Sequence, residues 1–112
     1  MKSKSRITIK PKKANPNLLP PVTPGEILKE ELIDALGMTI NSLALKIQVP
    51  ANRILAIVNG QRAISADTAL RLGRYFGMSP KFWLNLQQNY DLEITRRQKQ
   101  SEIETIVPRN AA

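Results

Sequence analysis

Signals that start and stop helices alternate along this chain, and they constrain its fold more than any other feature. Residues that cap a helix or open its first turn stand at Thr23-Pro24, Thr39, Pro50, Ser65 and Ser79-Pro80. Residues that end a helix stand at Gly37, Val49-Pro50, Asn59-Gly60 and Gly77. Apolar residues recur at helical spacing between these signals, and no segment shows sustained alternation of apolar and polar residues. The sequence therefore predicts an all-α bundle of five helices, the last running roughly to Arg97.

Two residue types are missing from the 112-residue chain, which has neither cysteine nor histidine. Their absence excludes disulfides, the usual zinc centres and serine–histidine or cysteine–histidine catalysis, and the scattered acids form no dense calcium-binding loop. We therefore expect no enzymatic activity, no catalytic residue, no cofactor and no metal site. The apolar runs are too short to span a bilayer and the N-terminus lacks a secretory signal, so we expect a cytoplasmic protein without a membrane partner.

Charge is distributed unevenly along the chain. Lysine and arginine exceed aspartate and glutamate by 17 to 9, and the net charge of +8 favours nucleic acid or an acidic protein surface as partner. Residues 1–20 are basic and proline-rich, and we expect a flexible arm there, followed by a folded domain over residues 21–98 and a C-terminal tail over residues 99–112. Within the domain, residues 23–36 are acidic and residues 46–81 are basic.

Residues 39–58 have the spacing of a DNA-binding helix-turn-helix. Two helices that cross steeply need a small residue where their backbones approach, and Ala44 provides it. Apolar anchors flank that position at Leu43, Ile47, Val49, Ile54 and Ile57. The turn has Gln48 where glycine is usual, and a left-handed backbone there would cost on the order of 1 kcal/mol. Ordinary pairs of bundle helices can show the same apolar spacing, which is the alternative interpretation.

The second helix of such a unit presents its N-terminal side chains to the major groove of DNA. Here these are Ala51, Asn52 and Arg53, followed by Ala56 one turn later. Asparagine can pair with adenine through two hydrogen bonds, arginine can bind guanine or phosphate, and alanine can pack on a thymine methyl group. The segment is therefore predicted to read DNA sequence.

Several blocks of residues, in order and correctly spaced, resemble the HigA/VapI antitoxins, a branch of the lambda-repressor-like (Xre-type) helix-turn-helix proteins. The blocks are Pro24–Leu28, Leu36–Thr39, Leu43–Ala44, Asn59–Ser65, Phe76–Pro80, Trp83–Gln87 and Tyr90–Leu92. The resemblance implies a five-helix lambda-repressor-like DNA-binding domain, a homodimer and repression of the protein's own operon through operator DNA. It also implies neutralisation of a HigB-type toxin, a RelE/ParE-like protein that is typically an mRNA endoribonuclease.

The motif and the resemblance together define a set of candidate DNA contacts. The family's base-reading positions correspond to Ala51, Asn52 and Ala56, with Arg53 adjacent and Arg62 placed near phosphate. The full candidate set is Thr39, Asn41, Lys46, Pro50, Ala51, Asn52, Arg53, Ala56 and Arg62.

A second set of residues is a candidate dimer surface. Phe82, Leu86, Tyr90 and Ile94 follow one another four residues apart on the last predicted helix and form one stripe. The folded part offers little core to cover so long a helix, so part of the stripe is expected to meet a second subunit. The alternative is that these residues belong to the core.

Three functions remain open on the sequence alone. The chain is a DNA-binding autorepressor that is also an antitoxin, a toxin inhibitor whose DNA binding is incidental or lost, or a stand-alone Xre-type regulator without a toxin. The acidic face of the first helix either grips a basic toxin or is simply solvated. The basic arm contacts DNA, contacts the toxin or only aids solubility.

Overall fold

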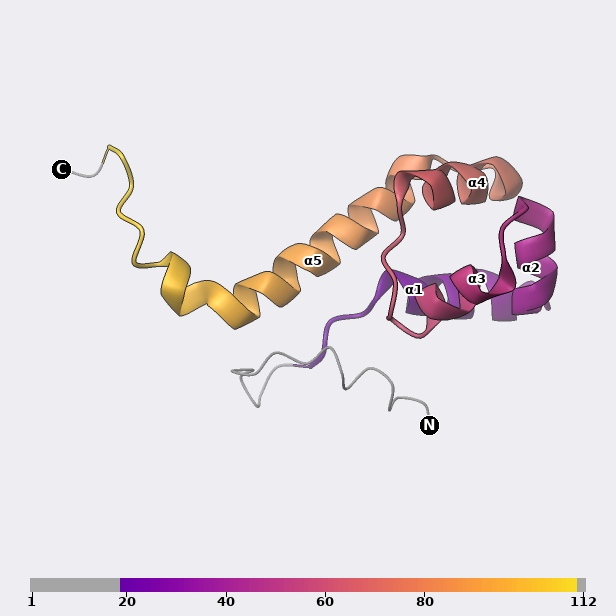
Figure 1. Cartoon of the computed structure of the whole chain (residues 1–112), viewed down its shortest axis with the longest axis horizontal. Helices are drawn as coiled ribbons and strands as arrows, with labels where there is room; N and C mark the ends of the chain where they lie inside the picture. The colour runs from indigo at the N-terminus through magenta and orange to yellow at the C-terminus, as the bar shows by residue number, and fades with distance from the viewer. Residues whose placement is uncertain (1–18, 111–112) are drawn as a thin grey trace.

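The computed structural model describes residues 19–110, and every regular element in that range is helical (Figure 1). The elements are α1 (Pro24–Ile27), η2 (Leu28–Asp34), α2 (Ile40–Ile47), α3 (Ala51–Val58), α4 (Ala66–Phe76) and α5 (Pro80–Ile103). The π-helix η2 continues α1 directly, so the two form the first predicted helix, and the all-α fold of five helices is confirmed. The predicted basic arm, residues 1–20, lies outside the described residues up to position 18.

Side-chain caps hold the helix starts at the predicted residues. At α1, the Thr23 hydroxyl accepts a hydrogen bond from the N–H of Glu26 (3.1 Å), and the Glu26 carboxylate accepts one from the N–H of Thr23 (2.9 Å). Thr39 and Ser42 form the same reciprocal pair at α2, both at 3.0 Å. Ser65 caps α4 through its hydroxyl. These bonds satisfy N–H groups that have no partner inside the helix, so each start is fixed locally.

The first helix and α3 approach so closely that only glycine fits between them. A β-carbon on Gly25 would lie 1.8 Å from the carbonyl oxygen of Ile57, which is too close without a movement of the backbone. Gly25 is buried in the first turn of α1. This contact seats α1 against the C-terminal end of α3.

The hydrophobic core lies between η2, α2, α3, α4 and the first turn of α5. Its largest fully buried apolar side chains are Trp83, Leu28, Ile33, Leu43, Ile54, Ile57 and Leu72. Of the residues of α5, all of which the structure describes, Trp83 alone is buried. The last helix is therefore anchored to the body at its N-terminal end.

The last helix is longer than predicted, since α5 does not end near Arg97 but continues to Ile103. Its C-terminal half extends away from the other helices (Figure 1). Ion pairs within the helix support this extension, because Glu93 binds Arg96 (2.9 Å) and Arg97 (2.7 Å) at helical spacing. The predicted C-terminal tail, residues 99–112, is thus helical up to position 103.

Two kinds of feature are not found between residues 19 and 110. No helix in this part of the chain combines the length and the apolar composition that crossing a bilayer requires. The same part contains no group of three or more acidic side chains placed to hold a metal ion.

Candidate nucleic-acid interface

The turn between α2 and α3 sets the angle at which the two helices cross. Gln48 adopts the left-handed conformation (φ 64°, ψ 49°), and it is the one residue other than glycine with a positive φ in the described range. The N–H of Val49 donates to the carbonyl oxygen of Ala44 (3.0 Å) and closes the end of α2. The left-handed turn that a helix-turn-helix requires is therefore present at Gln48, at a backbone cost of about 1 kcal/mol.

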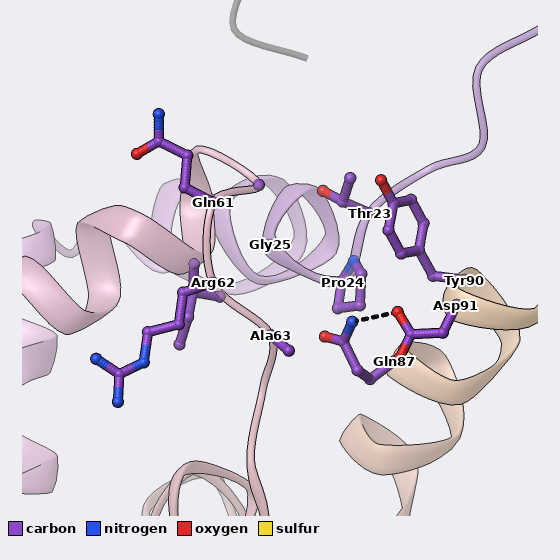
Figure 2. Close-up of a pocket in the computed structure, with 11 residues that line it drawn as sticks. Thr23, Pro24, Gly25, Gln61, Arg62, Ala63, Gln87, Tyr90 and Asp91 are labelled. Carbon is purple, nitrogen blue, oxygen red and sulfur yellow. Dashed lines mark hydrogen bonds between the residues drawn. The ribbon is translucent and has the colours of Figure 1, made fainter. Parts of the chain in front are cut away.

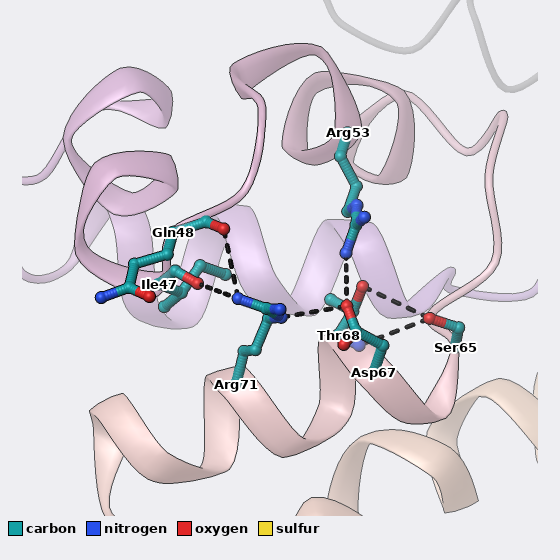
Figure 3. A network of polar contacts seen from close by, with 7 residues as sticks. All are labelled: Ile47, Gln48, Arg53, Ser65, Asp67, Thr68 and Arg71. Atoms are coloured by element: carbon teal, nitrogen blue, oxygen red, sulfur yellow. Dashed lines mark hydrogen bonds and ion pairs between the residues drawn. The ribbon is translucent and has the colours of Figure 1, made fainter.

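A side chain from α4 braces this turn (Figure 3). Arg71 Nη1 donates hydrogen bonds to the carbonyl oxygens of Ile47 (3.0 Å) and Gln48 (3.1 Å). Such carbonyls at a helix end lack a helical partner, and a cation there also suits the negative end of the helix dipole. Sequence reasoning missed Arg71, because 23 residues separate it from Gln48 and no local pattern links the two.

The two helices pack through the predicted residues. Ala44 is buried where the backbones approach. The anchors that are buried around it are Leu43, Ile47, Ile54 and Ile57. The helix-turn-helix packing predicted for residues 39–58 is thus confirmed.

One face of the unit brings predicted contacts from both helices together. A shallow recess of about 540 Å³ is lined by Thr39 and Asn41 of the α2 start and by Ala51, Asn52 and Leu55 of α3, and residues of η2, among them Lys29 and Asp34, close its other side. Asn41 and Asn52 are exposed, and Ala51 is half-buried. The face therefore presents amide groups beside an apolar floor.

Leu55 belongs to this face and was not among the predicted contacts. It lies one turn after Ala51, and 46% of it is exposed. A leucine in an apolar-rich helix is normally assigned to the core, so the sequence analysis did not count Leu55 as a surface residue. The four-residue spacing from Ala51 is the signal that would have identified it, because that spacing puts both side chains on one face.

Arg53 points away from this face and toward α4 (Figure 3). Its Nη1 lies 2.6 Å from Asp67 Oδ2, and only 22% of its side chain is exposed. Arg71 Nε donates to the same oxygen of Asp67 at 3.0 Å. The structure therefore places the Arg53 side chain against α4 and not on the exposed face that carries Asn52, where the motif predicted it.

Both arginines act on the ionisation of Asp67. The hydrogen bond from Arg53, followed by that from Arg71, holds the pKa of the Asp67 carboxyl below its ordinary value. The Asp67 side chain is 54% exposed, so solvent screens these pairs. The network's main effect is accordingly to fix positions, since it ties α3 and the turn to α4.

The other predicted contacts lie around the unit. Pro50 is exposed at the N-cap of α3, and Ala56 is half-buried within that helix. Lys46 is exposed near the end of α2, where it borders a separate recess with Arg74.

Arg62 lies in the connection between α3 and α4, beside a pocket of about 200 Å³ (Figure 2). Gln87 of α5 fixes this connection, because its side-chain oxygen accepts a hydrogen bond from the N–H of Ile64 (2.8 Å). Its amide nitrogen donates to Asp91 (3.0 Å). The Arg62 side chain is exposed and points away from Gln87 and Asp91, so it forms a cationic point beside α3.

Comparison with known proteins places this fold in one family. The sequence model described as "Helix-turn-helix" matches residues 28–83. Virulence-associated protein I of Dichelobacter nodosus is 47% identical over 95 residues, which cover 85% of this chain and 87% of that protein. An addiction module antidote protein of the HigA family from Coxiella burnetii has a similar structure, with a TM-score of 0.76 and 48% identity over 80% of this chain and 98% of that chain. The chain belongs to the HigA/VapI family of helix-turn-helix proteins.

Another member of the HigA family has been solved with DNA. The Pseudomonas aeruginosa antitoxin HigA with the higBA promoter matches with a TM-score of 0.77 and 40% identity, over 81% of this chain and 99% of that chain. The family resemblance predicted from the sequence blocks is thus confirmed, and so is the fold that it implied.

The four predicted dimer residues of this HigA-family chain do not share one environment. Leu86 packs against the core, and Ile94 is half-buried. Tyr90 is half-buried as well, and this burial is the main cause that raises the pKa of its phenol. Phe82 is 41% exposed. The fold therefore uses part of the stripe itself and leaves Phe82 the most accessible of the four.

Further apolar surface of this HigA-family chain lies toward the C-terminus. The exposed large apolar residues from α5 onward, beyond the predicted stripe, are Leu92, Ile103, Ile106 and Val107. Sequence reasoning missed Ile103, Ile106 and Val107 because it ended the last helix near Arg97 and assigned the residues beyond it to a tail. It missed Leu92 because this residue lies outside the stripe of residues four apart.

Proposed function

We propose that this HigA-family protein is the antitoxin of a type II toxin–antitoxin system and represses its own operon by binding operator DNA as a homodimer. The observation that carries this proposal is the face formed by α2 and α3, where Asn52 stands exposed beside an apolar recess. Family membership supports it, and one relative was solved with the higBA promoter.

Base reading is assigned to the exposed side of α3. Asn52 pairs with adenine in the major groove, and the apolar Ala51, Leu55 and Ala56 pack on thymine methyl groups. Contacts to the phosphate backbone, which position the protein without reading sequence, are assigned to Thr39, Asn41, Lys46 and Arg62. Pro50 is assigned to the same edge, where it contacts the backbone without a hydrogen bond.

The homodimer follows from the geometry of operators. Two recognition helices read half-sites that lie about one DNA turn, roughly 34 Å, apart, and this requires two copies in a fixed relation. The subunit contact is assigned to α5, with Phe82, Tyr90 and Ile94 joined by Leu92 and with Leu86 beneath them.

The toxin partner is assigned to a HigB-type, RelE/ParE-like mRNA endoribonuclease. Glu30 and Glu31 are exposed on η2 and give this helix an acidic edge, whereas neighbouring Asp34 is neutralised by Lys29 (2.9 Å). An acidic edge complements the basic surface that an RNA-cleaving protein needs for its substrate. The role is one of binding rather than catalysis, and it needs neither cofactor nor metal. It is carried out in the cytoplasm, where the operator lies.

Footprinting of the protein's own promoter tests the repressor function, and Asn52→Ala tests the reading face. We expect this variant to weaken operator binding by about 1–3 kcal/mol and to spare non-specific DNA, because it removes paired base contacts. Asn89→Ala is the matched control, since Asn89 is an exposed amide on α5. Equal losses of affinity for operator and non-specific DNA would instead show that Asn52 positions the protein and does not read sequence.

Co-purification with the product of the neighbouring gene tests the toxin partner. We expect capture by the wild-type chain, and weaker capture by the charge-reversed pair Glu30→Lys and Glu31→Lys. Operator binding without capture would leave a stand-alone Xre-type regulator. Capture without operator binding would leave a toxin inhibitor alone.

A further inference from the structure

The recognition helix carries one cation, and the fold binds that cation internally. Arg53 is the basic residue of α3, and its Nη1 lies 2.6 Å from Asp67 Oδ2 of α4. Figure 3 shows the side chain running from α3 toward α4, with Asp67 between Arg53 and Arg71. With 22% of its side chain exposed, Arg53 is largely withdrawn from solvent.

The position of Asp67 is itself fixed. Asp67 stands in the first turn of α4, directly after the Ser65 cap and Ala66, and Arg71 one turn later donates to it at 3.0 Å. Arg71 is tied in turn to the carbonyl oxygens of Ile47 and Gln48. The carboxylate is therefore held in place even when Arg53 is absent.

We propose that Asp67 is a specificity-determining residue, which restrains Arg53 against α4 and keeps its charge from DNA phosphates. The proposal rests on the proposed DNA-binding function. Phosphate contacts strengthen binding to every sequence alike, whereas base contacts distinguish sequences. By holding Arg53 against α4, Asp67 leaves the reading of DNA to the uncharged Asn52 and Leu55 and holds down non-specific affinity.

Two variants separate this role from base reading by Arg53. Arg53→Gln should lower operator affinity less than three-fold, because the restrained guanidinium contributes little to DNA contact. If Arg53 read a guanine, the same substitution would lower operator affinity by about ten-fold or more. Asp67→Asn should release Arg53, tighten non-specific binding several-fold and steepen the plot of log affinity against log salt by about 0.9 for each new phosphate contact. The ratio of operator to non-specific affinity should fall.

The double variant shows whether Arg53 is responsible for this gain. If Asp67 acts through Arg53, Asp67→Asn should give no gain in the Arg53→Gln background. A gain that persists would come from the lost negative charge alone and would overturn the proposal. Glu93→Gln is the matched control, because Glu93 also binds two arginines but lies on α5.

Affinities are measured by fluorescence anisotropy on operator and scrambled duplexes, with the full chain and below the thermal midpoint of each variant. A ten-fold operator loss for Arg53→Gln, or an unchanged salt slope for a folded Asp67→Asn, would overturn the inference. If Asp67→Asn does not fold, the operator affinity of Arg53→Gln still tests whether Arg53 is withheld from DNA. Failure of the wild-type chain to prefer its operator would instead reject the proposed function, so the two failures are distinguishable.

Discussion

Asn52 and Leu55 lie one turn apart on α3 and offer different chemistry to a DNA base. The amide of Asn52 carries hydrogen-bond groups for a base edge, whereas the half-exposed Leu55 offers only apolar surface. Thymine is the base with a methyl group in the major groove, so the two side chains together suit a run of A·T pairs. Ala51 and Ala56, being small, leave room for this approach.

Leu55→Ala should weaken operator binding, by about 1 kcal/mol for each methylene or methyl group of Leu55 that contacts DNA and is removed. Replacing the contacted thymine by uracil, which lacks the methyl group, should cost the wild-type protein a similar amount and the variant nothing further. Anisotropy titrations on operators scanned with uracil measure both. A uracil penalty that is unchanged in the variant would place the methyl group against another residue.

The network at Asp67 makes a predictable contribution to acid sensitivity. Its pKa is lowered in the fold by Arg53 and Arg71, so the stability that it confers is fully present above the ordinary carboxyl pKa of about 3.9. That stability is lost as the pH falls through the lowered value. The difference in free energy of unfolding between the wild type and Asp67→Asn should therefore shrink below about pH 4. Urea titrations at several pH values measure it, and a difference that grows on acidification would contradict the assignment.

Helix boundaries could be predicted where their causes are local. Thr23 and Thr39 cap helices through partners three residues away, and Gly77 ends α4 with a left-handed backbone, so a short stretch of sequence contains each signal. The orientation of Arg53 could not be predicted, because it depends on Asp67, which lies 14 residues further along the chain. The length of α5 escaped prediction for another reason, since its second half has no apolar face packed on the body to give a helical period.

Gly25, inside the first helix, and Gly37, in the turn that follows it, should respond differently to alanine. Gly25→Ala puts a β-carbon 1.8 Å from the Ile57 carbonyl oxygen, so the helices must separate, and we expect a loss of about 3 kcal/mol. Gly37 has a φ of +68° with open space around it, so Gly37→Ala should cost only about 1 kcal/mol. Urea denaturation followed by circular dichroism compares them. Equal losses would show that α1 and α3 adapt without strain.

At the scale of the whole molecule, the body and the last helix are distinct in their packing. The body, from α1 to the first turn of α5, contains the buried apolar side chains, whereas the rest of α5 is covered on one side at most. Exposed apolar residues recur along α5, among them Phe82 in its first turn and Leu92 further on. A second subunit on α5 would cover them, as the proposed homodimer requires.

Sedimentation equilibrium should return the mass of two chains for the wild type. Replacing both Phe82 and Leu92 by serine should shift the equilibrium toward single chains without a large change in stability, because neither side chain is buried in the core. Leu45→Ser is the matched control, since Leu45 is 78% exposed on α2. A wild-type mass of one chain would reject the homodimer, and dissociation by the control would move the contact to α2.

Because α5 is anchored to the body along its N-terminal half, at Trp83, Leu86 and Gln87, the molecule should have two rates of opening. Amides of the body should exchange with solvent only when the core unfolds, whereas those beyond Leu92 should exchange whenever the C-terminal half of α5 frays. A protease that attacks this end shortens the chain while the face formed by α2 and α3 stays folded. In the proposed homodimer, a partner that covers α5 would close this route, so proteolysis at this end should slow as the chain assembles.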